Sequence, residues 1–155
     1  MTAVAGGNQD GWVALTDDHV QSPDRTGARG GAGETSRGGE LNAELARTVV
    51  GIYRDAAGRG PTRAQAFFHG NVLVVLMEQV LTKVERALAE GGRPGSVHEM
   101  RDALQDAMRA ELIAAAERLT GAKVSALMVS NDVGSDMAAQ VFILDRPMPN
   151  PRTAG

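Results

Sequence analysis

The chain of 155 residues contains no cysteine, which excludes disulfides, thiolate zinc sites and cysteine nucleophiles. Aromatic residues make up only 3%. The net charge of −3 provides no basic field, so we expect no nucleic-acid partner. No apolar run approaches the roughly 20 residues that cross a bilayer, and the N-terminus lacks the pattern of a signal peptide. These absences favour a cytoplasmic protein with no transmembrane segment of its own.

Glycine is abundant, with 19 residues, but it is concentrated near the N-terminus. We expect residues 1–37 to form a disordered glycine-rich arm, 38–146 a single domain, and 147–155 a proline-rich extended tail. Trp12, the only tryptophan, lies in the arm beside Val13 and Leu15. This apolar cluster is either incidental or a short docking motif for a partner.

The first part of the domain predicts a helix followed by a β-hairpin. Apolar residues recur every three or four positions from about Gly39, and Gly58 with Pro61 should end this helix. Residues 63–68 alternate in character, and Gly70-Asn71 suits a tight turn. The strand after the turn is apolar on both faces, which favours a central place in its sheet.

The second part predicts two helices and another pair of strands. Thr82 with Glu85 and Ser96 with Glu99 both have the spacing of a capping box, and Gly121 should cap the second, long helix. Residues 123–129 and 139–144 are strand-like. The predicted order is α-β-β-α-α-β-β, an α+β fold with a mainly antiparallel four-stranded sheet and helices packed on one face.

The long helix carries charges where its apolar stripe should be. Arg101 and Glu111 both fall inside the stripe or at its border, about 15 Å apart along the axis. Because an unpaired buried charge is costly, each should have another partner. Either the two residues find counter-charges or extend their charged ends to solvent at the edge of the core, or they form a polar patch at a ligand pocket or subunit interface.

The segment Gly58-Arg59-Gly60-Pro61-Thr62-Arg63 resembles a phosphate-binding loop in composition. It leaves a helix C-terminus and enters a strand, however, and the dipole there is negative, so we reject a phosphate loop. We expect a structural turn in which Arg59 complements the last carbonyls of the helix. The alternative is an anion held by the side chains of Arg59 and Arg63.

The sequence offers no catalytic constellation and no metal-ligand spacing. We expect its histidines, His19, His69 and His98, to be exposed, and the turn with Asn131, Asp132 and Asp136 to need no cation. We therefore expect no enzyme activity, no metal and no cofactor.

Residues 39–145 resemble the MpsC-type domain, a bacterial family named from a sodium-translocating, membrane-potential-generating system. The resemblance rests on the following elements: Gly58-Arg59-Gly60-Pro61, Glu78, Leu81-Thr82 with Glu85, Arg101, Gln105, Met108, Glu111, Thr120-Gly121 and Val141-Phe142. The chain departs from the family at Met128-Val129-Ser130 and in its glycine-rich N-terminal arm.

This resemblance implies a non-enzymatic accessory or regulatory domain linked to membrane-potential generation or to ion and bicarbonate transport. Its partners would be membrane transport subunits and a second copy in a homodimer, and it would lie in the cytoplasm, peripheral to the inner face of the membrane. The alternative is a sensor that binds a small anion or nucleotide. The candidate ligand-binding or interface residues are Arg59, Arg63, Arg101, Gln105 and Glu111.

Overall fold

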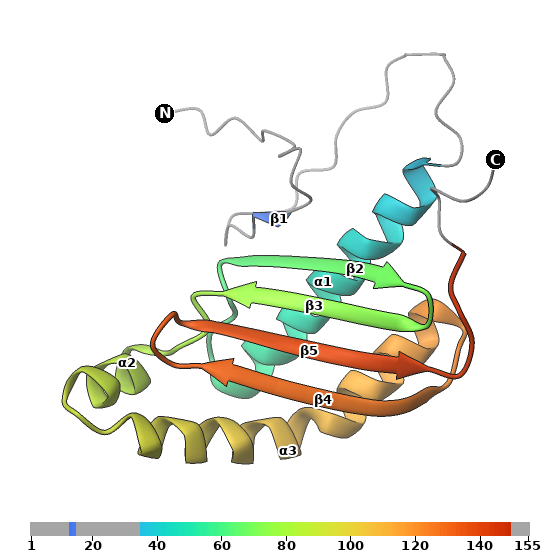
Figure 1. Cartoon of the computed structure of the whole chain (residues 1–155). Helices are drawn as coiled ribbons and strands as arrows, with labels where there is room; N and C mark the ends of the chain where they lie inside the picture. The colour runs from blue at the N-terminus through green and yellow to red at the C-terminus, as the bar shows by residue number, and fades with distance from the viewer. Residues whose placement is uncertain (1–12, 15–34, 150–155) are drawn as a thin grey trace, which may run out of the picture.

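The computed structural model describes residues 13–14 and 35–149 of the chain. Its elements follow the order β1 Val13–Ala14, α1 Thr35–Ala57, β2 Arg63–His69, β3 Val72–Glu78, α2 Lys83–Glu90, α3 Pro94–Thr120, β4 Val124–Asp132 and β5 Met137–Leu144 (Figure 1). The predicted α+β order and the four antiparallel strands are confirmed. A two-residue strand, β1, is added from the predicted arm, most of which lies outside the described residues.

The helix α1 forms where the sequence repeats apolar residues at helical spacing. Leu45, Val49 and Tyr53 are buried along one face. The helix ends as predicted, because Gly58 follows it at φ +77°, a conformation that side-chain-bearing residues avoid. It starts at Thr35, earlier than the predicted Gly39, because glycine weakens a helix without preventing it.

The sheet has the strand order β1-β2-β3-β5-β4, with every neighbouring pair antiparallel. Gly70, at φ +60°, makes the predicted turn between β2 and β3. The strand β3 lies between β2 and β5, so the prediction of a central position is confirmed. At one edge, β4 pairs with β5 through an irregular register, a bulge between Val124 and Ala126.

The two predicted capping boxes have different outcomes. At α2, Thr82 Oγ1 accepts from Glu85 N, and a Glu85 carboxylate oxygen accepts from Thr82 N, so this capping box is confirmed. The box at Ser96 is wrong, because α3 begins two residues earlier at Pro94, with Arg93 as N-cap and no side-chain cap. Proline is favourable at the first helical position, where its missing N–H needs no partner.

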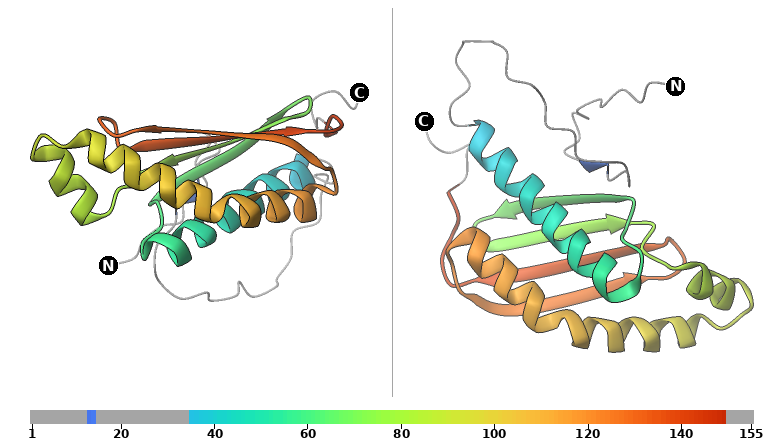
Figure 2. Two further views of the ribbon diagram at one scale, coloured as in Figure 1. Left: turned by 90° about the horizontal axis from the view of Figure 1, so that it is seen from below. Right: turned by 180° about the vertical axis from the view of Figure 1, so that it is seen from behind.

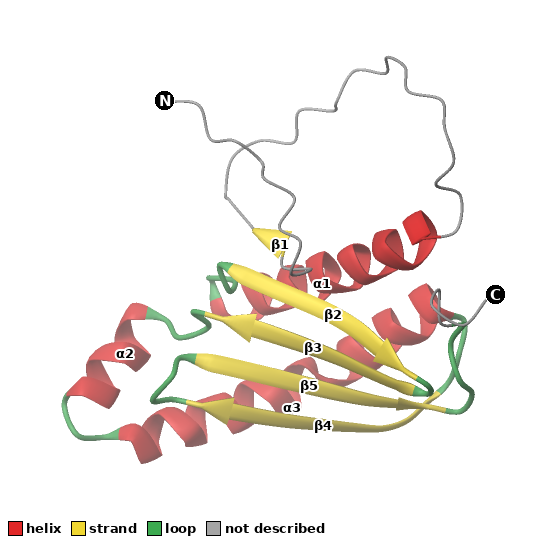
Figure 3. Ribbon diagram, turned by 45° about the horizontal axis from the view of Figure 1, so that its top comes forward, coloured by secondary structure: helices red, strands yellow, loops and turns green. Residues whose placement is uncertain are grey.

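The molecule has two layers, with α1 and α3 side by side on one face of the sheet (Figure 2). The core lies between these helices and the inward-facing side chains of the strands, including Leu73, Val75, Met77 and Phe142. The helix α2 and the first turns of α3 extend beyond the end of the strands (Figure 3). The opposite face of the sheet carries no helix among those that the structure describes.

Candidate functional site

Polar side chains are buried in the core at the point where α3 crosses from the protruding end of the molecule onto the sheet. Arg101 and Gln105 lie one turn apart on the buried stripe of α3, and Arg101 has only 2% of its surface exposed. Burying such groups is unfavourable unless they have hydrogen-bonding partners. Their partners therefore define the candidate site.

Arg101 binds the start of α2. Its Nη2 donates to the carbonyl oxygen of Val80 and to Glu85 Oε2, the latter at 2.5 Å. The same Glu85 oxygen accepts from Thr82 N at 2.7 Å in the capping box. One buried carboxylate thus completes the first turn of α2 and neutralises the arginine of α3. Arg101 Nε and Nη1 have no hydrogen-bond partner within the described part of the chain.

The loop of residues 79–82, between β3 and α2, has two further anchors. Arg59 Nη1 donates to the carbonyl oxygen of Leu81, the neighbour of the carbonyl that Arg101 binds. Asp136, from the turn between β4 and β5, accepts from Leu81 N at 2.8 Å and pairs with Arg86 at 3.1 Å. We call Arg59, Glu85, Arg101 and Asp136 the loop clamp, because their side chains fix one loop from three directions.

The predicted role of Arg59 at the end of α1 is therefore wrong. The segment after α1 brings Arg59 beside the 79–82 loop, where a carbonyl 22 residues away accepts its hydrogen bond. The interpretation of Gly58 to Arg63 as a structural turn agrees with this contact. The side chain of Arg59 fixes a neighbouring loop, and not the helix that precedes it.

A second buried cluster, the glutamine–tyrosine triad, lies one turn further along α3. Tyr53 Oη donates to Gln105 Oε1 at 3.0 Å and accepts from Gln140 Nε2 at 2.7 Å. Burial raises the pKa of Tyr53 above its ordinary value of 10.0, although the hydrogen bond from Gln140 and the charge of Arg101 act in the opposite direction. The triad therefore links α1, α3 and β5 through a phenol that is neutral at physiological pH.

The structure brings together three of the five predicted site residues. Arg59 and Arg101 hold adjacent carbonyls, and Gln105 lies one turn from Arg101. Arg63 lies elsewhere, on the helix-free face of the sheet, where it pairs with Glu78 at 3.1 Å. Glu111 is exposed, which corrects its expected burial: it lies about 80° from the centre of the buried stripe, at its margin.

Sequence reasoning missed Tyr53, Gln140 and Asp136 as parts of these clusters. A signal for Gln140 was present, because it alternates with Ala138 and Phe142 and so had to share their buried face. The strand pattern of β5 thus placed a polar residue in the core. For Asp136 there was no such signal, because its partners lie about 50 residues away in the chain.

The hydrogen bonds described for both clusters join helices, strands and one loop of the domain to each other. The described residues contain no group of three or more histidine, cysteine, aspartate or glutamate side chains that could hold a metal ion. Next to the loop clamp there is an open pocket between α2 and the β4–β5 turn, lined in part by Leu81, Arg86, Pro94 and Asp136.

His69 and His98 are exposed, as predicted, and His19 lies outside the described residues.

The sequence profile of one family, described as Na+-translocating membrane potential-generating system (MpsC), matches residues 37–146. The chain belongs to the MpsC family. The matched range of this MpsC domain runs from the first turn of α1 to just beyond β5, so it includes both buried clusters. Neither a curated protein nor a solved structure matches the chain.

The MpsC family takes its name from a membrane-potential-generating system. None of the helices in residues 35–149 combines the length and the apolar character that crossing a bilayer requires. The predicted family is confirmed by the match. The roles that the resemblance implied for partners, location and enzyme activity remain predictions.

Proposed function

We propose that this MpsC domain is a non-enzymatic accessory or regulatory subunit of a membrane-potential-generating, ion-translocating system, bound from the cytoplasmic side to an integral membrane subunit. The match to the MpsC family over residues 37–146 carries the proposal. That range spans the helices and four long strands, so the family relationship concerns the whole folded body.

The contacts of the loop-clamp side chains support a subunit more than an enzyme. Arg59, Arg101 and Glu85 are all engaged with the loop before α2 or the first turn of that helix. A catalytic residue must instead reach a substrate within hydrogen-bonding distance. Groups that fix the protruding α2 end give this region a defined shape for contact with a partner.

The exposed side chains at the α2 end also support a contact there. Val84 on α2 is 63% exposed and Met100 on α3 is 44% exposed, although both are large and apolar. Single exposed apolar residues are common, but these two are on the helical segments that extend beyond the sheet (Figure 3). We infer that the transport subunit binds this end.

Cross-linking in native membranes tests the proposal. Lys83, at the start of α2, and Lys123, between α3 and β4, are the lysines of the chain. An amine-reactive cross-linker also reacts with the N-terminal amine, so lysine variants are needed to assign the contacted end. We expect the full chain to capture an integral membrane subunit of the transport system. Lys83→Arg should abolish this product, whereas the matched variant Lys123→Arg should retain it.

A functional measurement completes the test. Deleting the gene should lower the membrane potential of cells, measured with a voltage-sensitive dye, and the full chain should restore it. An unchanged potential, together with no captured membrane subunit, would overturn the proposed function.

One observation favours a second candidate, the anion or nucleotide sensor. Arg101 Nε and Nη1 are buried donors without a described partner, and an open pocket adjoins the loop that Arg101 binds. A ligand at 100 times its dissociation constant should stabilise the domain by about 2.7 kcal/mol. In a thermal-shift screen with bicarbonate, phosphate and nucleotides, one of these ligands should raise the melting temperature of the wild type but not that of Arg101→Met. If none of them raises the melting temperature of the wild type, the sensor is rejected.

A further inference from the structure

The helix-free face of the sheet is ordered into four rows of side chains, one from each of β2, β3, β5 and β4. The strand registers define the rows, because paired residues share a face. From the α2 end, the rows are Arg63-Glu78-Met137-Asp132, Gln65-Leu76-Ala139-Ser130, Phe67-Val74-Val141-Met128 and His69-Val72-Ile143-Ala126. The face is charged at one end and mostly apolar over the rest, with polar residues only at the ends of the second and fourth rows, on the outer strands β2 and β4.

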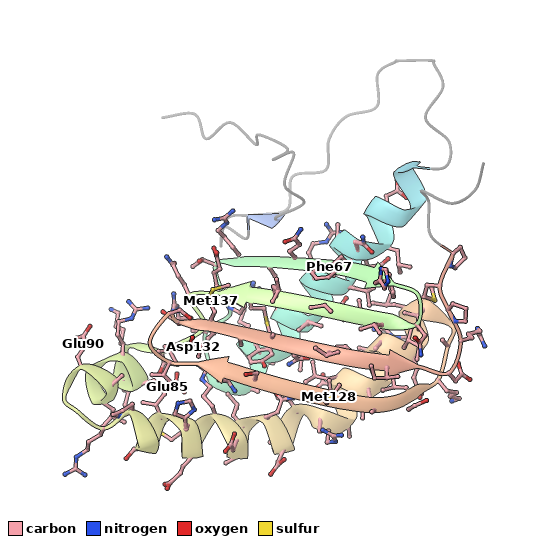
Figure 4. The ribbon with its side chains drawn as sticks, viewed as in Figure 1. Phe67, Glu85, Glu90, Met128, Asp132 and Met137 are labelled. Atoms are coloured by element: carbon pink, nitrogen blue, oxygen red, sulfur yellow. The ribbon has the colours of Figure 1, made fainter. Side chains whose placement is uncertain are left out.

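The third row has an apolar side chain on each of its four strands, from β2 to β4. Its end members, Phe67 on β2 and Met128 on β4, are 36% and 54% exposed, and they lie on opposite sides of the face in Figure 4. With Val84 and Met100, they are the exposed large apolar residues of the described chain. A continuous apolar row with exposed ends is typical of a surface that packs against another one.

We propose that this face binds the same face of a second copy of the chain, about a two-fold axis that runs parallel to the strands between β3 and β5. Such an axis reverses the order of the strands but preserves the rows. It therefore places β2 over β4 of the partner subunit, and Phe67 against Met128 of the partner subunit, twice. Aromatic–thioether contacts of this kind are favourable, and aligned sheets pack about 10 Å apart.

The charged row selects this axis. With the rows preserved, Arg63 faces Asp132 of the partner subunit, so opposite charges meet at both symmetry-related sites. A two-fold axis perpendicular to the strands would instead place the charged first row over the fourth. Arg63 and Glu78 would then keep only each other as counter-charges, and Asp132 would be buried against Ala126 of the partner subunit without one, which is unfavourable.

The area of the face suits a reversible dimer. Four strands about 4.8 Å apart and about seven residues long give a flat area of about 440 Å² per copy. Two copies would bury about 900 Å² if their faces were flat, and projecting side chains add to this area. The total is close to the lower limit of about 1,000 Å² for a specific interface. We therefore expect an equilibrium between monomer and dimer that depends on concentration.

Other occupants fit this face less well. Residues 1–34 contain few large apolar residues, and Val13 and Ala14 are already paired with the edge of β2. An anionic bilayer would be repelled by a chain of net charge −3. A second copy, in contrast, supplies an equally large apolar surface and the matching charges.

Sedimentation velocity of the purified full chain tests the proposal without any membrane partner, so its outcome is separate from that of the proposed function. We expect a concentration-dependent dimer. Phe67→Glu and Met128→Glu should each raise its dissociation constant at least about tenfold, because a charge would be buried. The matched variants Val84→Glu and Met100→Glu, at exposed sites on the helices, should leave it unchanged.

Cross-linking tests the direction of the axis. Since the chain has no cysteine, Phe67→Cys and Met128→Cys each introduce a single thiol. A short bis-maleimide should join a mixture of the two variants far better than either variant alone, because residue 67 faces residue 128 of the partner subunit. Efficient cross-linking of either single variant alone would overturn this axis.

Two further results would overturn the proposal as a whole. One is a dimer that persists unchanged in both glutamate variants. The other is a chain that stays monomeric up to several hundred micromolar; if Met128→Glu then also shifted the fluorescence of Trp12, the only tryptophan, the N-terminal arm would be identified as the occupant. Far-UV circular dichroism of each variant shows whether a loss of dimer reflects unfolding.

Discussion

Glu85 and Arg101 form a buried ion pair in which Glu85 Oε2 lies 2.5 Å from Arg101 Nη2, and the side chains are 4% and 2% exposed. Because Glu85 also caps the first turn of α2, the attachment of α2 to α3 and the start of α2 depend on one carboxylate. The position of the protruding end relative to the sheet is therefore set by charge and hydrogen bonding as well as by apolar packing.

Glu85→Gln should be among the most destabilising single changes in this domain. It keeps the shape of the side chain but leaves the Arg101 charge buried without a counter-charge, and we expect a loss of about 3–5 kcal/mol. Urea unfolding measures the loss. The control is Arg86→Ala, which breaks an exposed pair with Asp136 and should cost less than about 1 kcal/mol. Equal losses in the two variants would contradict a special role for the buried pair.

Gly58→Ala and Gly51→Ala should change stability in opposite directions. Both positions have room for a methyl group, with no atom within 4 Å of the added carbon. Gly58 has φ +77°, so alanine there should destabilise by about 1 kcal/mol. Gly51 lies inside α1, where alanine should stabilise by about 0.5–1 kcal/mol. Thermal and urea unfolding test both, and a stabilising Gly58→Ala would contradict the left-handed cap.

Arg59→Ala should loosen the loop of residues 79–82. The variant loses the hydrogen bond to Leu81 O, and we expect a cost of about 1–2 kcal/mol, because the donor is charged. Amide hydrogen exchange should become faster in this loop and at the start of α2. Arg54→Ala, an exposed arginine in the last turn of α1, is the matched control and should leave exchange in the loop unchanged.

Tyr53 should ionise at a higher pH in the folded protein than in the unfolded chain. Burial raises its pKa from 10.0, so the folded state retains the phenol proton over a range in which the unfolded state has lost it. This contribution to stability is fully present below pH 10 and falls as the pH rises above it. Tyr53 is the only tyrosine, so tyrosinate absorbance of native and urea-unfolded protein measures both values. Identical titration curves would contradict the buried triad.

The elements that sequence analysis predicted correctly depend on local signals. The 3.6-residue period identified α1, and the alternation in β2 with the glycine turn after it identified the hairpin. Arg101 was also recognisable, because a charge on an apolar stripe is visible without the structure. The α3 start was mistaken because Ser96 and Pro94 are competing start signals two residues apart, and proline at the first position prevailed.

The partners of the site residues were not predictable in the same way. The carbonyls that accept from Arg59 and Arg101 lie more than 20 residues away in the chain, in the loop of residues 79–82. Asp136 joins this loop only because the β4–β5 turn meets it across the end of the sheet. These contacts depend on tertiary packing, which cannot be read from the spacing of apolar residues in the sequence.

The bulge between Val124 and Ala126 has a consequence for the behaviour of the protein at high concentration. β4 is an edge strand, and a regular edge offers a row of backbone groups to which the strands of other molecules can add without limit. The shifted register interrupts that row, while β1 covers part of the opposite edge on β2. Association through the face stops at two copies, whereas growth along the edges, which leads to fibrils, is obstructed at both sides.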